Sequence, residues 1–199
     1  MNRFYKNKKK YILLFSFFIL IIVSVLIYFY VIKKKEQKLY SFSEKLENKY
    51  ETLSLYSDNN TVEDYSTLNS PGIIGKIEIP KISLSYSILS SCSEDLLKIS
   101  PCRLYGPDPN QVGNLCIAGH NYDNNKFFSN INKLSLGDSI YIYDLNNNFL
   151  IYTIYDKFEV LINDTSILNQ ETQNKKEITL ITCNNQNKRR FILKAKEMD

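Results

Sequence analysis

Three residues whose side chains could together break an amide bond lie at the ends of apolar runs in this sequence. Cys183 closes the run T-L-I-T-C, His120 closes I-A-G-H, and Arg190 opens the last apolar run. A thiol attacks only as its thiolate, which a nearby imidazolium favours, and the imidazole can then protonate a leaving amine. A guanidinium is a permanent cation that can stabilise an oxyanion. These residue types predict attack on an amide, provided that the fold brings them together.

The histidine and the cysteine also have a purely structural interpretation. A single histidine is more often a satisfied structural residue, and a cysteine at a strand end is more often a small apolar side chain. A second cysteine competes for the role of nucleophile, because Cys116 precedes His120 by four residues and would share its face on a continuous strand. Its apolar neighbours are typical of a core, so we favour Cys183.

The spacing of the four cysteines limits what else they can do. Intervals of 10, 14 and 67 residues contain no C-x-x-C pair, which disfavours a structural zinc site. Cys92 and Cys102 are the nearest pair for a disulfide if the domain faces outward, and free thiols are an equal alternative because spacing does not show geometry. The single histidine excludes sites that need two imidazoles, such as a helical H-E-x-x-H zinc protease.

The charge of the chain is unevenly distributed. The formal net charge is +4, but residues 1–38 hold nine Lys and Arg and one acidic residue, so the remaining chain is mildly acidic. A mildly acidic body is a poor candidate for binding nucleic acid. With 44% hydrophobic residues and only 6 Gly and 5 Pro, a collagen-like or largely disordered chain is also excluded.

Residues 11–32 form an uncharged run that predicts a transmembrane anchor. A helix of this length reaches about 33 Å, enough for a bilayer core of roughly 30 Å. A cleaved signal peptide is the alternative, but its apolar region is usually shorter and is followed by small residues, whereas lysines 33–35 follow here. Residues 1–10 would be a basic cytoplasmic tail, although five basic residues before the span against four after it barely decide the orientation.

A stalk is expected after the anchor, at residues 33–70. A stripe at helical spacing consists of Leu39, Phe42, Leu46, Tyr50 and Leu53. We interpret it as a stalk helix that lies on the next domain or near the membrane, rather than as a coiled coil or a partner-binding helix. Residues 57–70 are polar and predict a linker, which Pro71 and Gly72 close.

Residues 71–199 predict one mostly β domain. Strand-like runs occupy residues 73–79, 82–88, 114–119, 139–143, 149–155, 157–161, 178–183 and 191–196. Residues 144–148 predict a hairpin turn, and short helices are expected at 93–99, capped by Ser93, near 127–134 and after Asp164. About eight strands with few helices predict a sandwich or a closed barrel. A hairpin of the last two strands would bring Arg190 beside Cys183.

The sequence motifs around the candidate residues resemble those of the sortases, the Gram-positive cysteine transpeptidases. Residues 179–183 (T-L-I-T-C) resemble the sortase T-L-x-T-C signature, and A-G-H ending at His120 is similar to the histidine motif. Arg190 and the apolar residues after it resemble the arginine strand; Arg189 competes, and we prefer Arg190 because the family arginine directly precedes such residues or nearly so. The resemblance covers about residues 72–196.

The resemblance implies an eight-stranded sortase-type β-barrel held outside the cell membrane by a single-pass anchor. Cys183 would attack an LPxTG-like sorting signal between Thr and Gly and form a thioester. An amine of a cell-wall peptidoglycan precursor or of a pilin would then resolve the thioester. His120 would act as acid and then base, and Arg190 would hold substrate and stabilise the oxyanion. No cofactor or metal is implied, since the sequence has no acidic cluster that compels the calcium site of some relatives.

A class D-like enzyme is the expected subclass. The stretch at residues 162–177 is too short for the helical insertion of class B, and no second apolar span follows Arg190, unlike many class C members. Two alternatives from other classes stay open. One is a non-catalytic anchored β-barrel module that binds a surface or cell-wall partner, and the other is a thiol–disulfide protein that uses Cys92 and Cys102.

Overall fold

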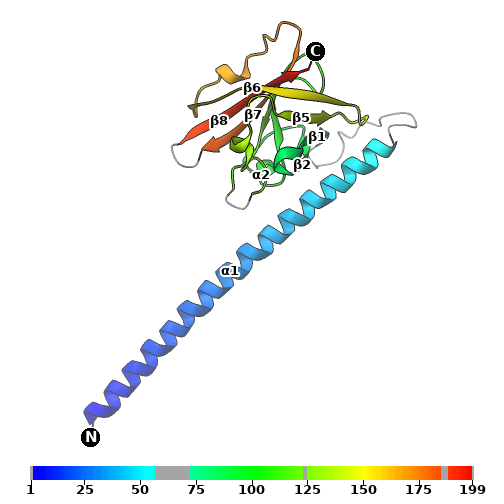
Figure 1. Ribbon diagram of the computed structural model, residues 1–199. Coiled ribbons are helices and arrows are strands. Elements are labelled where there is room, and N and C mark those ends of the chain that lie inside the picture. Colours follow the sequence, from blue (N-terminus) through cyan, green and yellow to red (C-terminus); the bar gives the residue numbers. More distant parts are fainter. Residues whose placement is uncertain (1, 57–71, 123–124, 185–187, 199) are drawn as a thin grey trace. The chain divides into compact units, whose positions relative to one another are not determined.

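The computed structural model describes residues 2–56, 72–122, 125–184 and 188–198 (Figure 1). The chain forms two compact units, Met1–Ser41 and Phe42–Asp199. The linker predicted at residues 57–70 lies outside the described residues.

Helix α1 (Asn2–Tyr56) runs without a break through both the predicted anchor and the predicted stalk. The two expected helices are one because no Gly or Pro occurs anywhere in this stretch. The segment Phe15–Lys38 has a mean hydropathy of 2.8 and no buried residue, and by length and composition alone it is a candidate membrane span. Further along, within the second unit, Leu46 is buried against Leu89 and Cys102.

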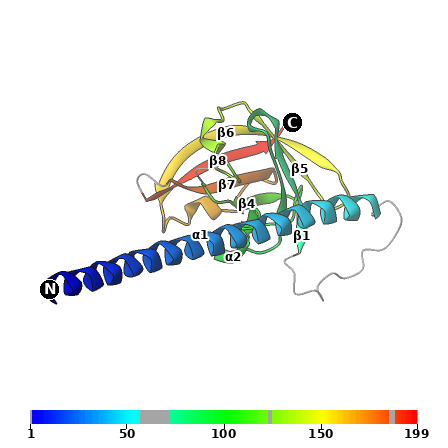
Figure 2. The same ribbon diagram turned by 90° about the horizontal axis from the view of Figure 1, so that it is seen from below.

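Eight strands close into a barrel, so the predicted mostly β class is confirmed and the barrel alternative is correct (Figures 1 and 2). The strands are β1 (Ile73–Ile79), β2 (Leu84–Leu89), β3 (Cys102–Tyr105), β4 (Gly113–Ala118), β5 (Ser139–Tyr143), β6 (Phe149–Leu161), β7 (Lys176–Asn184) and β8 (Arg189–Glu197). Their order around the barrel is β1-β2-β3-β4-β7-β8-β6-β5. Only the β2–β3 and β4–β7 pairs of these strands are parallel.

Two strands differ from the prediction. β3 was not expected, and it is a short strand that pairs with β4 and meets β2 at a single position. β6 joins the two runs predicted at 149–155 and 157–161 into one strand, because a bulge between Ile154 and Asp156 lets it continue its pairing with β8.

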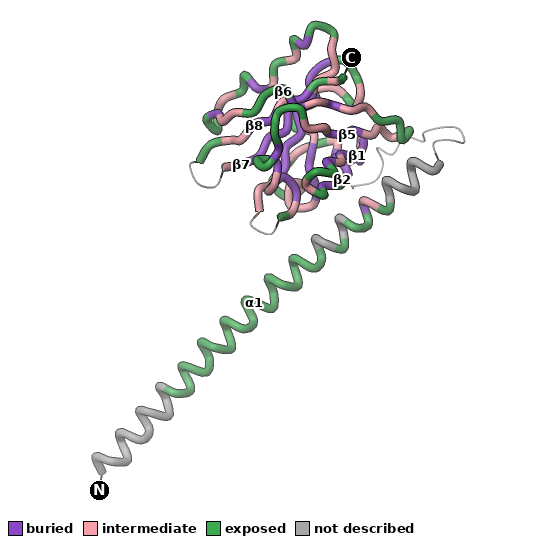
Figure 3. The backbone as a smooth tube through the Cα atoms, viewed as in Figure 1, coloured by how far each residue is buried: buried purple, intermediate pink, exposed green. Residues whose placement is uncertain are grey.

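Strands β4 and β7 are buried on both faces over most of their length, as Figure 3 shows for β7 in purple. Their inner faces fill the barrel with Leu115, Ile117, Ile178 and Leu180. Their outer faces belong to a second cluster, which includes Cys116, Ile181, Ile192 and Ile167. Since a strand packed on both sides cannot easily shift, the ends of β4 and β7 are rigid places on which to hold a site.

All but one of the short elements follow the sequence prediction; the exception is the 3-10 turn at Pro80–Ile82, which was not expected. α2 (Glu94–Leu97) begins after Ser93, whose side chain accepts a hydrogen bond from the amide of Leu96 at 3.3 Å. The other short helices are the 3-10 turns η3 (Pro80–Ile82), η4 (Ile131–Lys133) and η5 (Ser166–Leu168). The predicted hairpin turn at 144–148 is present, closed by the Asp144 amide donating to the Asn148 carbonyl at 2.9 Å.

Candidate active site

His120 and Cys183 lie at the same edge of the barrel because β4 and β7 are parallel neighbours. The two strands pair in register up to Ala118 opposite Ile181. Contact continues beyond that pair, since the amide of Gly119 donates to the carbonyl of Ile181 at 3.0 Å. Parallel neighbours end at the same edge, about 4.8 Å apart. His120 and Cys183 each lie two residues past the last pair, at this same edge of the barrel.

Two side-chain hydrogen bonds link the chain just after β4 to the end of β7. Thr182 Oγ1 donates to the carbonyl of Gly119 at 2.7 Å, and Thr182 is buried. Asn121 Nδ2 donates to the carbonyl of Cys183 at 2.9 Å. Each bond ties the end of one strand to the chain at the end of the other, so the positions of His120 and Cys183 are coupled.

Arg190 faces Cys183 from the next strand. β7 and β8 are antiparallel, and their register sets Cys183 opposite Arg190 and Asn184 opposite Arg189. Directly opposed residues of an antiparallel pair point to the same face of the sheet. Of the two arginines, Arg190 is therefore the one that shares a face with Cys183. The hairpin expected for the last two strands is present, and Cys183 itself is exposed.

Close packing around Gly119 determines where His120 lies. A Cβ atom at Gly119 would come within 2.6 Å of the ring of Phe128, so only glycine fits there. The amide of Phe128 in turn donates to the carbonyl of His120 at 3.0 Å. The ring of Tyr122 lies 4.9 Å from the His120 ring, centroid to centroid. Among the residues that the structure describes, the buried Nε2 of His120 has no hydrogen-bond partner.

Comparison with known proteins identifies the family and the fold. The model of the sortase domain matches residues 77–198, which is more than half of the chain. The chain belongs to the sortase family. It is 35% identical over 119 residues to sortase A of Bacillus anthracis, covering 59% of this chain and 55% of that protein. It is 24% identical over 135 residues to sortase A of Listeria monocytogenes, covering 67% and 60%. The match thus spans little more than half the length of either relative.

Solved structures of sortases resemble this chain over a larger part of its length. A Clostridium perfringens sortase D5 transpeptidase superposes with a TM-score of 0.66 and 32% identity, covering 80% of this chain and 99% of that one. A Clostridium perfringens sortase C superposes with a TM-score of 0.59 and 26% identity, covering 79% and 89%.

Burial and two charges of opposite sign act on His120 of this sortase. Burial lowers the pKa of the imidazole from its usual value, and this is the largest effect. The carboxylate of Glu94 acts to raise that pKa, and the ammonium group of Lys98 acts to lower it. Both charges lie in or next to α2. The imidazole is therefore neutral near pH 7, and the segment around α2 tunes its basicity.

Cys116 does not have the properties of a nucleophile in this sortase. Its side chain is fully buried, and its Sγ lies 3.6 Å from the carbonyl of Asn114 and 3.8 Å from that of Ile167. Burial raises the pKa of its thiol to about 11. A thiolate is thus scarce at neutral pH, and no substrate can reach the sulfur without opening the outer cluster.

Several residues near the site were not singled out from the sequence. Asn121 directly follows the histidine motif, and Thr182 precedes the cysteine inside the T-C signature, so adjacency to the motifs is the signal that could have found them. Glu94 and Lys98 could not be found in that way, because they are 26 and 22 residues before His120 and approach it only through the fold. Within the described ranges, no group of three or more His, Cys, Asp or Glu could hold a metal ion.

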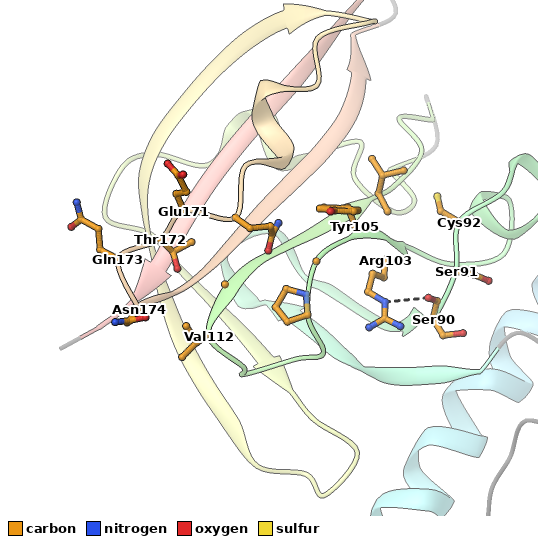
Figure 4. A pocket seen from close by; sticks show the side chains of 15 residues that line it. Ser90, Ser91, Cys92, Arg103, Tyr105, Val112, Glu171, Thr172, Gln173 and Asn174 are labelled. Carbon is orange, nitrogen blue, oxygen red and sulfur yellow. Dashed lines mark hydrogen bonds between the residues drawn. The ribbon is translucent and has the colours of Figure 1, made fainter.

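A cavity of about 1030 Å³ lies elsewhere on the barrel (Figure 4). It extends along β3 and the segment before β7, and its lining includes Cys92, Arg103, Tyr105 and Thr172. None of the three candidate catalytic residues lines it. The cavity is therefore separate from the face that carries Cys183.

Proposed function

We propose that this sortase is a cysteine transpeptidase in which Cys183 is the nucleophile, His120 the general acid and base, and Arg190 the group that stabilises the oxyanion. One observation carries the proposal: Arg190 on β8 lies opposite Cys183 on β7, and His120 lies two residues past the end of β4, the parallel neighbour of β7.

The first half-reaction transfers an acyl group to sulfur. The neutral imidazole of His120 accepts the thiol proton, and the Cys183 thiolate attacks the carbonyl carbon of the residue before the scissile bond. Negative charge then develops on the carbonyl oxygen, where the guanidinium of Arg190 stabilises it. The imidazolium gives its proton to the leaving amine, the C–N bond breaks, and a thioester remains on Cys183.

The second half-reaction regenerates the enzyme. An acceptor amine attacks the thioester carbonyl, and His120 takes the proton that the amine loses. The C–S bond breaks as the new amide forms, and the proton returns to the departing sulfur. The lowered pKa of His120 suits both roles, because the imidazole is a free base before attack and a competent acid once it is protonated.

We take the substrate to be the LPxTG-like C-terminal sorting signal of a surface protein, cleaved between Thr and Gly. A similar sortase C of Clostridium perfringens has been solved with the C-terminal cell wall sorting motif, which supports this class of substrate. The acceptor would be an amine of the cell wall or of a pilin. The apolar segment of α1 would hold the enzyme in the cell membrane by a single pass, with the barrel on the outer side and residues 1–10 in the cytoplasm.

The test uses the full chain in detergent micelles with quenched peptides that carry LPxTG variants and an added amine. Cys183→Ala and His120→Ala should lower turnover by roughly 10³-fold or more, while Cys116→Ala, the matched cysteine control, should keep it. Arg190→Ala should lower kcat by about 10²–10³-fold, and Arg189→Ala should have a much smaller effect. Mass spectrometry should find the acyl group on Cys183.

Turnover that survives Cys183→Ala but not Cys116→Ala would reverse the assignment of the nucleophile. A chain that binds sorting peptides without cleaving any of them would instead be a non-catalytic binding module. Equal losses for Arg189→Ala and Arg190→Ala would contradict the role given to the register between β7 and β8.

A further inference from the structure

A second pair of cysteines, remote from Cys183, packs together at the base of the segment that carries α2. Cys92 lies three residues after the end of β2, and Cys102 begins β3. β2 and β3 meet through Leu89 opposite Cys102, so the chain leaves and re-enters the barrel at one place. Residues 93–101 form the loop between the two cysteines.

The two side chains share one apolar cluster and differ in access. Cys102 is fully buried in a small apolar cluster with Leu89, and Cys92 packs against that cluster. Cys102 Sγ lies 3.3 Å from the carbonyl of Ser100. Cys92 is partly exposed and lines the cavity, where Figure 4 shows it next to Ser91. An external reagent can therefore reach one sulfur of the pair directly.

The structure assigns Cys92 and Cys102 as a disulfide-forming site that cross-links the base of the α2 loop. Both cysteines are free thiols in the structure. The other two cysteines have different surroundings, because Cys116 lies among the carbonyls of the outer cluster and Cys183 lies on the face with Arg190. The inference rests on the proposed function in one respect: a barrel outside the membrane meets the oxidising conditions in which disulfides persist.

The oxidation needs an external disulfide, either a small-molecule disulfide or the oxidised form of a thiol–disulfide oxidoreductase. The Cys92 thiolate attacks one sulfur of that disulfide, forms a mixed disulfide and releases the first thiol. The Cys102 sulfur, after losing its proton, attacks the sulfur of Cys92 and releases the second thiol. Two electrons pass from the protein to the external disulfide. The neighbouring Cys102 thiol lowers the pKa of the Cys92 thiol, which supports Cys92 as the attacking sulfur.

The cross-link bears on catalysis through α2. The loop that it closes contains Glu94 and Lys98, the two charges that act on His120. Fixing both ends of this loop restricts how far these charges can move from the imidazole. We therefore expect stronger hydrogen-exchange protection of the α2 amides in the oxidised protein than in the reduced one.

The test uses the full chain in micelles with Cys183→Ala, which prevents disulfides between molecules through the exposed cysteine. After equilibration with oxidised glutathione, the protein should lose 2 Da, and denatured protein should show about one free thiol instead of about three. Peptide mapping should join residue 92 to residue 102. The Tm should rise by about 5–10 °C over the reduced protein.

Cys92→Ser is the matched control, since it changes a partly exposed side chain and leaves the buried Cys102 in place. This variant should keep its fold but lose both the mass change and the dependence of Tm on oxidant. Three titratable thiols after oxidation, or a cross-link to Cys116, would overturn the inference. Neither readout requires transpeptidation, so failure here and failure of the proposed function are distinguishable.

Discussion

Replacing Gly119 by alanine is a direct test of how the barrel positions His120. The added Cβ would meet the Phe128 ring at 2.6 and 2.7 Å, where ordinary contacts begin at 3.4 Å, so the ring must retreat by about 0.8 Å. Phe128 is only 1% exposed and packs in the main core, so it has no free space to enter. Overpacking of this kind typically costs about 1–3 kcal/mol. The same strain displaces His120, whose carbonyl accepts from the Phe128 amide.

We expect Gly119→Ala to lower the free energy of unfolding by about 2 kcal/mol and kcat/KM by about 10–100-fold, since a misplacement of about 1 Å can cost 10²-fold. Urea unfolding and peptide cleavage measure the two effects. Phe128→Leu in the same chain should restore part of both. Gly137→Ala is the control: its φ of +88° strains alanine, but nothing lies near its Cβ, so stability falls while kcat/KM stays. Unchanged activity in folded Gly119→Ala would refute the reasoning.

Four further predictions concern charge and polar contacts. His120 gives one imidazole signal in an NMR titration, and its midpoint should rise in Lys98→Met and fall in Glu94→Gln; unchanged midpoints would exclude control by α2. The pKa of His120 in the folded protein lies below its unfolded value near 6.5, so the unfolded chain binds more protons. The free energy of unfolding should therefore fall as the pH drops below about 6.5, and it should fall less steeply in His120→Gln. Asn114→Ala should cost about 2–4 kcal/mol in urea unfolding, since this fully buried amide has three hydrogen-bond partners. Asn121→Ala should lower kcat several-fold with little loss of stability.

The strands that could be predicted from the sequence are those whose burial alternates or whose apolar run is long. β1 alternates buried and half-buried residues along its whole length, as its sequence indicates. The pairing of Cys183 with Arg190 could also be predicted from the sequence, because it depends only on a short connection between two consecutive strands. Local patterns carry this information, and both predictions needed nothing from elsewhere in the chain.

Other features depend on contacts that local patterns do not contain. β3 spans only Cys102–Tyr105, and half of it is exposed, so its strand conformation comes from pairing with β4 rather than from its own residues. The bulge that keeps β6 continuous past Ile154 is likewise visible only against its partner β8. The two runs predicted at 149–155 and 157–161 form one strand, β6, and the unpredicted β3 makes up the difference. The expected number of strands is therefore right, although two of the assignments behind it are wrong.

The candidate site combines both kinds of information. Parallel strands end at a common edge, and the next antiparallel strand begins there, so residues at the ends of β4 and β7 and at the start of β8 converge once these three strands are neighbours. This convergence brings His120 to Cys183 across 63 positions of sequence. The protonation of His120 is a different matter, because it responds to charges on a loop between two other strands. A barrel could thus keep the three residues in place and still change its pH dependence by altering residues 93–101 alone.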